Sequence, residues 1–330
     1  MGQCPTVTPA EPASGEATEE ERKRVRNLPF NQPGRFYRGN LHTHSTRSDG
    51  MVPAKQVLQA YQQHGYDFVA ITDHFLPQYD FPITDTRLLR TPAFTTLLGA
   101  EIHPPALRSG DRWHIVAVGL PIDFAPPRDD EDAPAMAARA AATGAFVGLA
   151  HPAWYGLTVE DAESIAASAD AVEIYNETCA QLNDRSDGWY LCDLLLARGH
   201  HLLAYGSDDA HFTARQDRFG AWVNVRAESL DPTALLAALK AGHFYSSQGP
   251  QIEQLTITGS RLELTCSPAR AVFVAGRGAR ARSALAPTGD LTSCRLDLAP
   301  FAGSYCRVTI VDAAGKRAWT NPFWLDLAVH

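Results

Sequence analysis

The chain has 330 residues, of which 45% are hydrophobic, and its formal net charge is −8. This length is sufficient for one large α/β domain and a smaller second domain. The acidic balance argues against binding along a nucleic-acid backbone, and no apolar run approaches the roughly 18 residues that cross a membrane. The six cysteines are scattered, and residues 1–21 lack the apolar core of a signal peptide, so we expect a cytoplasmic protein with buried thiols.

The first third of the chain predicts a tail, a strand, a helix and a second strand. Residues 1–35 are polar and end in Pro-Gly, which indicates a flexible or loosely docked tail. A strand is expected at 36–42. A helix should cover 53–62, because a proline suits its first turn and the apolar residues have helical spacing. The apolar run 67–72 is typical of a strand buried on both faces of a parallel sheet.

The same alternation continues to residue 250. Further strands are expected at 94–101, 114–119, 145–150, 171–176, 201–206 and 219–225, and helices at 133–142, 159–167, 187–198 and 232–240. Alternating strands and helices indicate either a βα barrel or a doubly wound sheet. Reactive residues follow most of the strands, which favours the barrel, because its strand ends converge at one mouth.

The pattern changes after residue 250. Short runs of alternating polarity predict a small all-β domain over residues 251–330, of the sandwich type. Three of the cysteines, Cys266, Cys294 and Cys306, lie in this part and could form a disulfide if the protein were exported.

Residues that bind divalent metals recur at the strand ends. His42 and His44 are one residue apart and therefore point to the same side of a strand. Asp209 and His211 repeat this spacing. Further candidates at strand starts or ends are Asp73, His74, Glu101, His114 and His151. Imidazole nitrogens and carboxylate oxygens are the ligands that catalytic divalent metals take in proteins, so the pattern predicts a metal site.

In chain order, His42-x-His44, Asp49, Asp73-His74, Glu101, His114, His151-Pro152 and Asp209-x-His211 resemble the motifs of the polymerase-and-histidinol-phosphatase (PHP) family of metal-dependent hydrolases. The resemblance spans about residues 36–250. It implies a distorted (β/α)7 barrel with two or three divalent ions of zinc, manganese or iron. Residues 242–250 and the β region ending in Trp319-Thr320-Asn321-Pro322 further resemble the carbaryl-hydrolase-like branch of that family.

The resemblance also implies which residues hold each ion. The first would be bound by His42, His44, Glu101 and Asp209, the second by Glu101, His114 and His151, and the third by Asp49, His74 and His211. Some family members have His where this chain has Asp49. The occupancy of the third position is therefore open, and an oxygen ligand there favours manganese or magnesium.

The predicted function is hydrolysis of a small phosphate ester by a hydroxide that bridges the metal ions. The same centre could hydrolyse a carbamate or an amide. A non-catalytic metal- or carbohydrate-binding protein is the alternative from a different class, suggested by the terminal β region. A small-molecule substrate is expected rather than nucleic acid, and the sequence does not indicate an oligomeric state.

Other roles are less firmly indicated. Catalytic roles are expected for Asp73, Asp209 and Glu101. Asp73 could orient a histidine, take a proton or cap a helix, and Asp208 could replace Asp209 as a ligand. Contacts with the substrate are expected from Arg47, Asn176, Arg215 and Arg218, although the arginines could also be solvated. His103 should face away from Glu101 if its strand continues.

Overall fold

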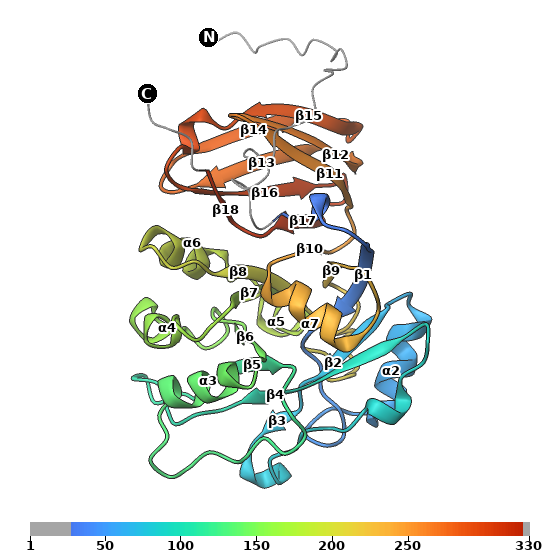
Figure 1. Ribbon diagram of the computed structural model, residues 1–330, viewed down its shortest axis with the longest axis vertical. Coiled ribbons are helices and arrows are strands. Elements are labelled where there is room, and N and C mark those ends of the chain that lie inside the picture. Colours follow the sequence, from blue (N-terminus) through green and yellow to red (C-terminus); the bar gives the residue numbers. More distant parts are fainter. Residues whose placement is uncertain (1–27, 326–330) are drawn as a thin grey trace.

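The computed structural model describes residues 28–325, so most of the expected tail and Cys4 lie outside the described residues. The protein is a mixed α/β molecule with one large sheet and few helices (Figure 1). The strands up to residue 250 are β1 (Arg35–Asn40), β2 (Phe68–Ile71), β3 (His74–Phe75), β4 (Thr95–Ile102), β5 (Ile115–Val118), β6 (Phe146–Leu149), β7 (Ala171–Asn176), β8 (Leu203–Ser207), β9 (Trp222–Ala227) and β10 (Phe244–Ser247).

All helices but one lie close to predicted positions. The helices are α2 (Ala54–Gln63), α3 (Ala133–Ala142), α4 (Val159–Ile165), α5 (Glu177–Asn183), α6 (Trp189–Ala197) and α7 (Pro232–Lys240), with short 3-10 turns η1 (Pro29–Asn31), η2 (Pro77–Tyr79), η3 (Arg87–Leu89) and η4 (Ala299–Phe301). Asp132 and Asp231 cap α3 and α7 by accepting backbone N–H bonds, which satisfies amides that the helix leaves unpaired. The sequence analysis missed α5, which has only seven residues. In the described part of the chain, no helix is both long and apolar enough to cross a membrane.

Strand directions differ from those of a regular parallel sheet. The order is β10-β9-β1-β2-β4-β5-β6-β7-β8, and β5 and β9 run antiparallel to both of their neighbours. The segment between β4 and β5 contains no helix, so it cannot make the crossover that a parallel pair requires. The start of β5 consequently lies at the same edge of the sheet as the carboxyl ends of β4 and β6.

The remaining strands are β11 (Ile252–Thr258), β12 (Arg261–Ala269), β13 (Ala271–Gly276), β14 (Ala281–Leu285), β15 (Leu291–Asp297), β16 (Tyr305–Val311), β17 (Arg317–Thr320) and β18 (Phe323–Trp324). β11, β12 and β15 form a second sheet, and β14, β13, β16 and β17 extend the large sheet through pairing of β17 with β10. Residues of both sheets share one apolar cluster. The large sheet runs from β10 into β17 without a break. The domain boundary predicted at residue 250 stays a prediction.

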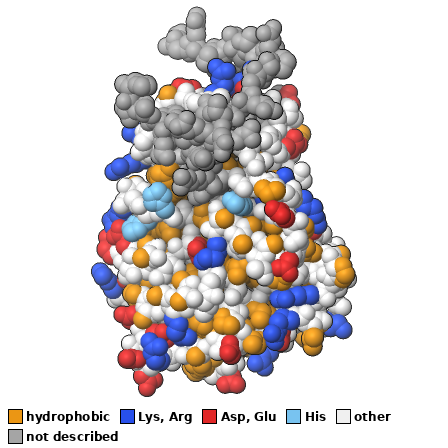
Figure 2. Space-filling view, in the orientation of Figure 1, with side chains coloured by type: hydrophobic (Ala, Val, Ile, Leu, Met, Phe, Trp, Pro, Cys, Tyr) orange, Lys and Arg blue, Asp and Glu red, His pale blue; other side chains and the backbone are white. Residues whose placement is uncertain are grey.

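Two other expectations about this region can be compared with the structure. Leu28 and Phe30 are buried in the same apolar cluster, so the end of the predicted tail packs against the β region. Cys266, Cys294 and Cys306 are free thiols, so the disulfide considered for an exported protein is not formed. On the face shown in Figure 2, acidic and basic side chains are interspersed among hydrophobic ones over the described residues.

Side chains join β8, at one end of the strand order, to β10. Ser246 Oγ accepts a hydrogen bond of 2.9 Å from the backbone N–H of Gly206. Asn321 is fully buried, and its amide accepts from Ala204 N at 2.9 Å and donates to the carbonyls of Gly242 and Phe244 at 3.0 Å. The helix α7 packs against β4, β6 and β9, so strands that are distant in the sheet order lie around one helix.

Asn321→Ala should therefore destabilise the protein by about 2–3 kcal/mol, because it leaves the buried N–H of Ala204 and the buried carbonyl of Phe244 without partners. The free energy of unfolding, measured by denaturant titration, checks this value. Asn31→Ala is the matched control, since Asn31 is exposed. Equal stabilities of the two variants would contradict the bridging role of Asn321.

Candidate metal centre

The predicted ligands converge at one edge of the large sheet. His42 and His44 follow β1, His151 follows β6, and Asp209 and His211 follow β8. Glu101 is near the end of β4, and His74 begins β3. His114 immediately precedes β5, and the reversed direction of that strand brings it to the same edge. All of the predicted ligand residues take part in groups whose ligand atoms lie within 4.8 Å of one another.

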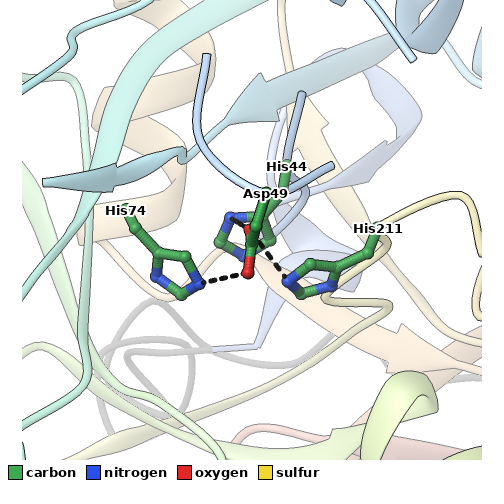
Figure 3. A group of neighbouring side chains, drawn as sticks. All are labelled: His44, Asp49, His74 and His211. Carbon is green, nitrogen blue, oxygen red and sulfur yellow. Dashed lines mark ion pairs between the residues drawn. The ribbon is translucent and has the colours of Figure 1, made fainter. Parts of the chain in front are cut away.

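The outermost group consists of His44, Asp49, His74 and His211 (Figure 3). The carboxylate of Asp49 points between the rings, with Oδ2 3.3 Å from His74 Nε2 and Oδ1 3.3 Å from His211 Nε2. Its side chain is 41% exposed, whereas that of His44 is fully buried. This group contains the three residues of the third predicted position together with His44. It opens toward solvent.

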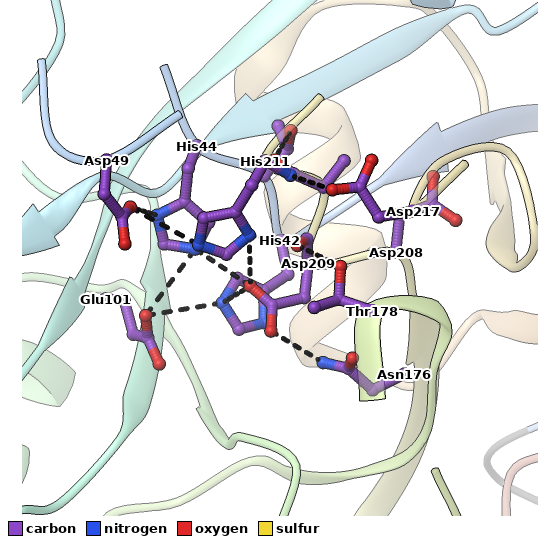
Figure 4. A network of polar contacts seen from close by, with 12 residues as sticks. His42, His44, Asp49, Glu101, Asn176, Thr178, Asp208, Asp209, His211 and Asp217 are labelled. Atoms are coloured by element: carbon purple, nitrogen blue, oxygen red, sulfur yellow. Dashed lines mark hydrogen bonds and ion pairs between the residues drawn. The ribbon is translucent and has the colours of Figure 1, made fainter. Parts of the chain in front are cut away.

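The next group lies deeper and surrounds one oxygen of Glu101 (Figure 4). Glu101 Oε2 lies 3.6 Å from Nε2 of both His42 and His44. Asp209 Oδ1 lies 3.2 Å and 2.9 Å from the same two nitrogens. Two imidazoles and two carboxylates therefore face one small volume, as the first predicted position requires.

The other oxygen of Glu101 faces a different pair of rings. Glu101 Oε1 lies 2.6 Å from His114 Nδ1 and 3.2 Å from His151 Nε2. The two oxygens of Glu101 thus face separate groups of histidines. A carboxylate that bridges two cations would be placed in this way. Two-metal hydrolytic sites place their ions about 3.5–4 Å apart, a spacing that one carboxylate can span.

Unpaired buried atoms provide a test of whether cations fit here. His42 Nε2 and Glu101 Oε2 are buried, and neither has a hydrogen-bond partner among the described residues. Each atom lies within ion-pair distance of a neighbour, His42 Nε2 of Asp209 Oδ1 at 3.2 Å and Glu101 Oε2 of His74 Nδ1 at 2.7 Å, and a bound cation would give both a direct partner. The donor set of imidazoles and carboxylates suits zinc, manganese or iron. The residues present therefore fit divalent cations.

The charges of the cluster are strongly coupled. Burial disfavours the charge on His42, but Asp209, Glu173 and Glu101 outweigh it and raise the pKa of His42 well above its usual value. Against the same effect of burial, Glu101 and Asp49 raise the pKa of His74 to about 11. Asp49 and Asp209 likewise raise the pKa of His211 to about 9. Without cations, these histidines hold protons that balance the buried carboxylates.

Glu173, in β7, supports the ligands from behind. Its Oε1 accepts hydrogen bonds from His42 Nδ1 at 3.1 Å and from Ser207 Oγ. Its Oε2 accepts from the backbone N–H of His151 at 2.6 Å, and from Asn176 Nδ2 at 3.0 Å. His151 has a φ of +22°. The hydrogen bond from its backbone N–H to Glu173 holds the backbone in this unfavourable conformation. The sequence analysis did not assign a role to Glu173, although a carboxylate inside a buried strand requires a partner.

Asn176 is also fully buried, and its contact with a substrate stays a prediction. Its Nδ2 donates to Asp209 Oδ2 at 3.2 Å, and its Oδ1 accepts from Cys179 N at the start of α5. Asn176 thus fixes both a candidate ligand and a helix. Asp208 points away from the cluster, toward Tyr61 and the backbone of 219–221, which leaves Asp209 as the candidate ligand.

Asp73 fixes the loop that carries Asp49. Its carboxylate accepts hydrogen bonds from Ser45 N, Ser45 Oγ, Ser48 Oγ and Thr84 Oγ1. The hydrogen bonds of the described residues join it to no histidine, and His74 begins a strand rather than a helix, so the predicted histidine contact and helix cap are wrong. The catalytic role expected of Asp73 stays a prediction.

His103 lies against the cluster, because the strand whose continuation would have turned it away ends before it. β4 ends at Ile102, and the chain turns so that His103 Nε2 lies 2.8 Å from His74 Nδ1. The other nitrogen, Nδ1, donates to the carbonyl of Trp113 at 2.7 Å. Sequence periodicity could not reveal this contact, because it depends on where the strand ends.

A pocket of about 390 Å³ lies over the cluster, lined by most of the candidate ligands, by residues of α5 and by the loop after His211. Among the arginines expected to contact substrate, only Arg215 lines it. Arg47 is exposed on the loop before Asp49 and lies outside the lining. Arg218 contacts the rings of Phe212 and Phe219 and lines a different depression, so its predicted role is not supported.

Metal binding should release protons from the metal-free protein at pH 7, because cations compete with protons for the nitrogens of His42, His74 and His211. Affinity should accordingly rise with pH until these nitrogens lose their protons. Calorimetric titration with Zn²⁺ in two buffers of different ionisation enthalpy measures the release. Identical binding enthalpies in both buffers would contradict the prediction.

Glu173→Gln should weaken metal affinity about 10–100-fold, since it alters the hydrogen bonds that hold His42 and His151 without removing a ligand. Competition with a chromogenic chelator measures the affinity. Glu163→Gln is the control, because Glu163 pairs with Arg198 away from the cluster. A role in packing alone would be indicated if Glu173→Gln bound metal as tightly as this control.

Comparison with known proteins gives a likeness in structure only. No protein-family model matches the chain, and no curated protein matches its sequence. The chain is similar to a two-domain protein from Bacteroides vulgatus that contains a predicted PHP-like metal-dependent phosphoesterase, with a TM-score of 0.51, 15% identity and coverage of 86% of this chain and 94% of the other.

Two further similar structures have lower scores. One is a candidate metal-dependent phosphoesterase from Bifidobacterium adolescentis, with a TM-score of 0.40, 16% identity and coverage of 62% and 96%. The other is a lesion-specific endonuclease from Pyrococcus furiosus, with a TM-score of 0.43, 14% identity and coverage of 62% and 56%. At these identities the comparisons show that the chain shares the fold of the Bacteroides protein over most of its length.

Proposed function

We propose that the protein is a metal-dependent hydrolase of the PHP type that acts on a small phosphate ester. The observation that carries the proposal is the position of Glu101, a buried carboxylate whose oxygens face two separate groups of histidines. The fold shared with a protein that contains a predicted PHP-like phosphoesterase supports it. The contacts of Ser246 and Asn321 between β8 and β10 support closure of the strands into the distorted (β/α)7 barrel expected from the sequence.

In this proposal each group of ligands holds one ion. The first group is His42, His44, Glu101 and Asp209, and the second is Glu101, His114 and His151, so Glu101 belongs to both groups. The third group is Asp49, His74 and His211. Bound ions lower the pKa of water and polarise the bond to be broken. Zinc, manganese and iron all suit these donors.

The residues around the pocket favour a phosphate ester and attack by water. Arg215 lines the pocket and offers a guanidinium that suits a phosphate oxygen. Cys179 also lines the pocket, but burial raises the pKa of its thiol, so it is a poor nucleophile at neutral pH. Attack by water is therefore favoured over a covalent intermediate on the protein.

The resemblance to the carbaryl-hydrolase-like branch supports a second candidate, a carbamate or amide hydrolase that uses the same centre. Arg215 favours the phosphate ester, because a neutral carbamate gains less from a guanidinium in the pocket. The cytoplasmic location stays a prediction from the sequence.

The purified protein loaded with Mn²⁺ or Zn²⁺ should hydrolyse members of a panel of phosphomonoesters. His42→Ala should lower kcat/KM by more than about 100-fold, since it removes a ligand rather than a support for one. His64→Ala is the matched control, because His64 is exposed at the end of α2. Hydrolysis of carbamates and not of phosphoesters would decide for the second candidate, and turnover unchanged in His42→Ala would refute both.

A further inference from the structure

The pocket over the cluster has an apolar wall that the ligands do not explain. Trp154 and Leu182 line the pocket, as do the loop residues Thr213, Arg215 and Asp217. Leu182 is 44% exposed and Trp154 is half-buried. Large apolar side chains that remain exposed around a concave site usually contact a ligand.

Trp154 stands directly beside two candidate metal ligands. Its ring centroid lies 5.5 Å from that of His114 and 5.5 Å from that of His151, with steep angles between the ring planes. A turn sets this position, because the backbone N–H of Trp154 donates to the carbonyl of His151 at 2.9 Å. A part of the substrate that packs against this indole would therefore lie close to the bond that is hydrolysed.

Leu182 is held by a helix that is tied to the same cluster. The backbone N–H of Thr178 in α5 donates to the carbonyl of Asp208 at 2.9 Å, and its Oγ1 donates to the carbonyl of Asp209 at 2.7 Å (Figure 4). Arg185, which follows α5, donates to the carbonyl of Trp154 at 3.3 Å. These bonds hold the backbone segments that carry the two apolar side chains next to the cluster and to each other.

The polar part of the pocket is built by a separate loop. Asp217 is buried, and its Oδ2 accepts hydrogen bonds from His211 N, Thr213 N and Thr213 Oγ1. Phe212 and Gln216 in this loop have φ values of +60° and +55°, a conformation that such residues adopt only when surrounding contacts hold it. The loop thus contributes Arg215 to the lining of the pocket, while Trp154 lies beside His114 and His151.

We propose that Trp154 and Leu182 bind the alcohol part of the substrate and select an aromatic or similarly planar apolar group. The inference rests on the proposed phosphoesterase function and names its substrate class. The phosphoryl group lies over the cluster within reach of Arg215, and the ring lies against the indole of Trp154. Hydrolysis forms a P–O bond to water and breaks the P–O bond to the alcohol oxygen, which takes up the proton as inorganic phosphate is released.

Benzyl phosphate and propyl phosphate provide the test, because both release a primary alcohol and differ mainly in the ring. The metal-loaded protein should hydrolyse benzyl phosphate with a kcat/KM at least roughly tenfold higher. Trp154→Ala and Leu182→Ala should each reduce this ratio, and Trp154→Phe should retain most of it because it keeps a ring. Leu88→Ala should leave the ratio unchanged, since Leu88 is 97% exposed and lies outside the pocket lining.

A binding measurement separates failure of this inference from failure of the proposed function. Benzylphosphonate, which cannot be hydrolysed at its P–C bond, should bind the metal-loaded protein roughly tenfold more tightly than propylphosphonate by calorimetry, and Trp154→Ala should abolish the difference. Equal kcat/KM values for the two phosphates, or a ratio that Trp154→Ala does not change, would overturn the inference and leave the phosphoesterase intact. If no phosphoester is hydrolysed, the proposed function fails, and equal phosphonate affinities would then overturn the apolar site as well.

Discussion

The carboxylate of Glu101 is fully buried in the middle of a sheet edge, and neutralising its charge is the constraint on which the surrounding structure depends. Burial by itself would raise its pKa, but His114, His74, His103 and His42 hold that pKa well below the usual value. A buried negative charge is tolerated only when cations or protons balance it. The protein surrounds this one carboxylate with imidazoles from several strand ends. These imidazoles would be the ligands of a cation that replaces their protons.

The fold supplies these imidazoles through the directions of its strands. Because β5 is reversed, His114 lies at the start of its strand and still reaches the edge where β4 and β6 end. A second set of buried groups then fixes the ligands in place. Glu173 holds His42 and the strained backbone of His151, and Asn176 holds Asp209. The same bonds continue into α5, so the wall of the pocket and the cluster beneath it form one connected network.

Much of the site could be predicted from the sequence, because spacing of one residue on a strand and position at strand ends are local properties. His42, His44 and Asp209 converge for that reason. What the sequence could not provide depends on the path of the chain in space. His103 approaches His74 only because β4 stops at Ile102, and the pairing of β10 with β17 across the expected domain boundary depends on residues far apart in the chain. Arg218 illustrates the same limit, since no pattern indicated that it would turn toward two phenylalanine rings.

The central claim is that Glu101 bridges two cations. Anomalous X-ray diffraction from crystals of the protein grown with Mn²⁺ or Zn²⁺ tests it most directly, because the peaks locate the ions independently of any assay. Apart from any peak at the third position, the account predicts two peaks at Glu101, each about 2.0–2.2 Å from a different oxygen of this carboxylate, one beside His42 and His44 and the other beside His114 and His151. Peaks that lie only elsewhere, or a single peak that does not contact Glu101, would contradict it.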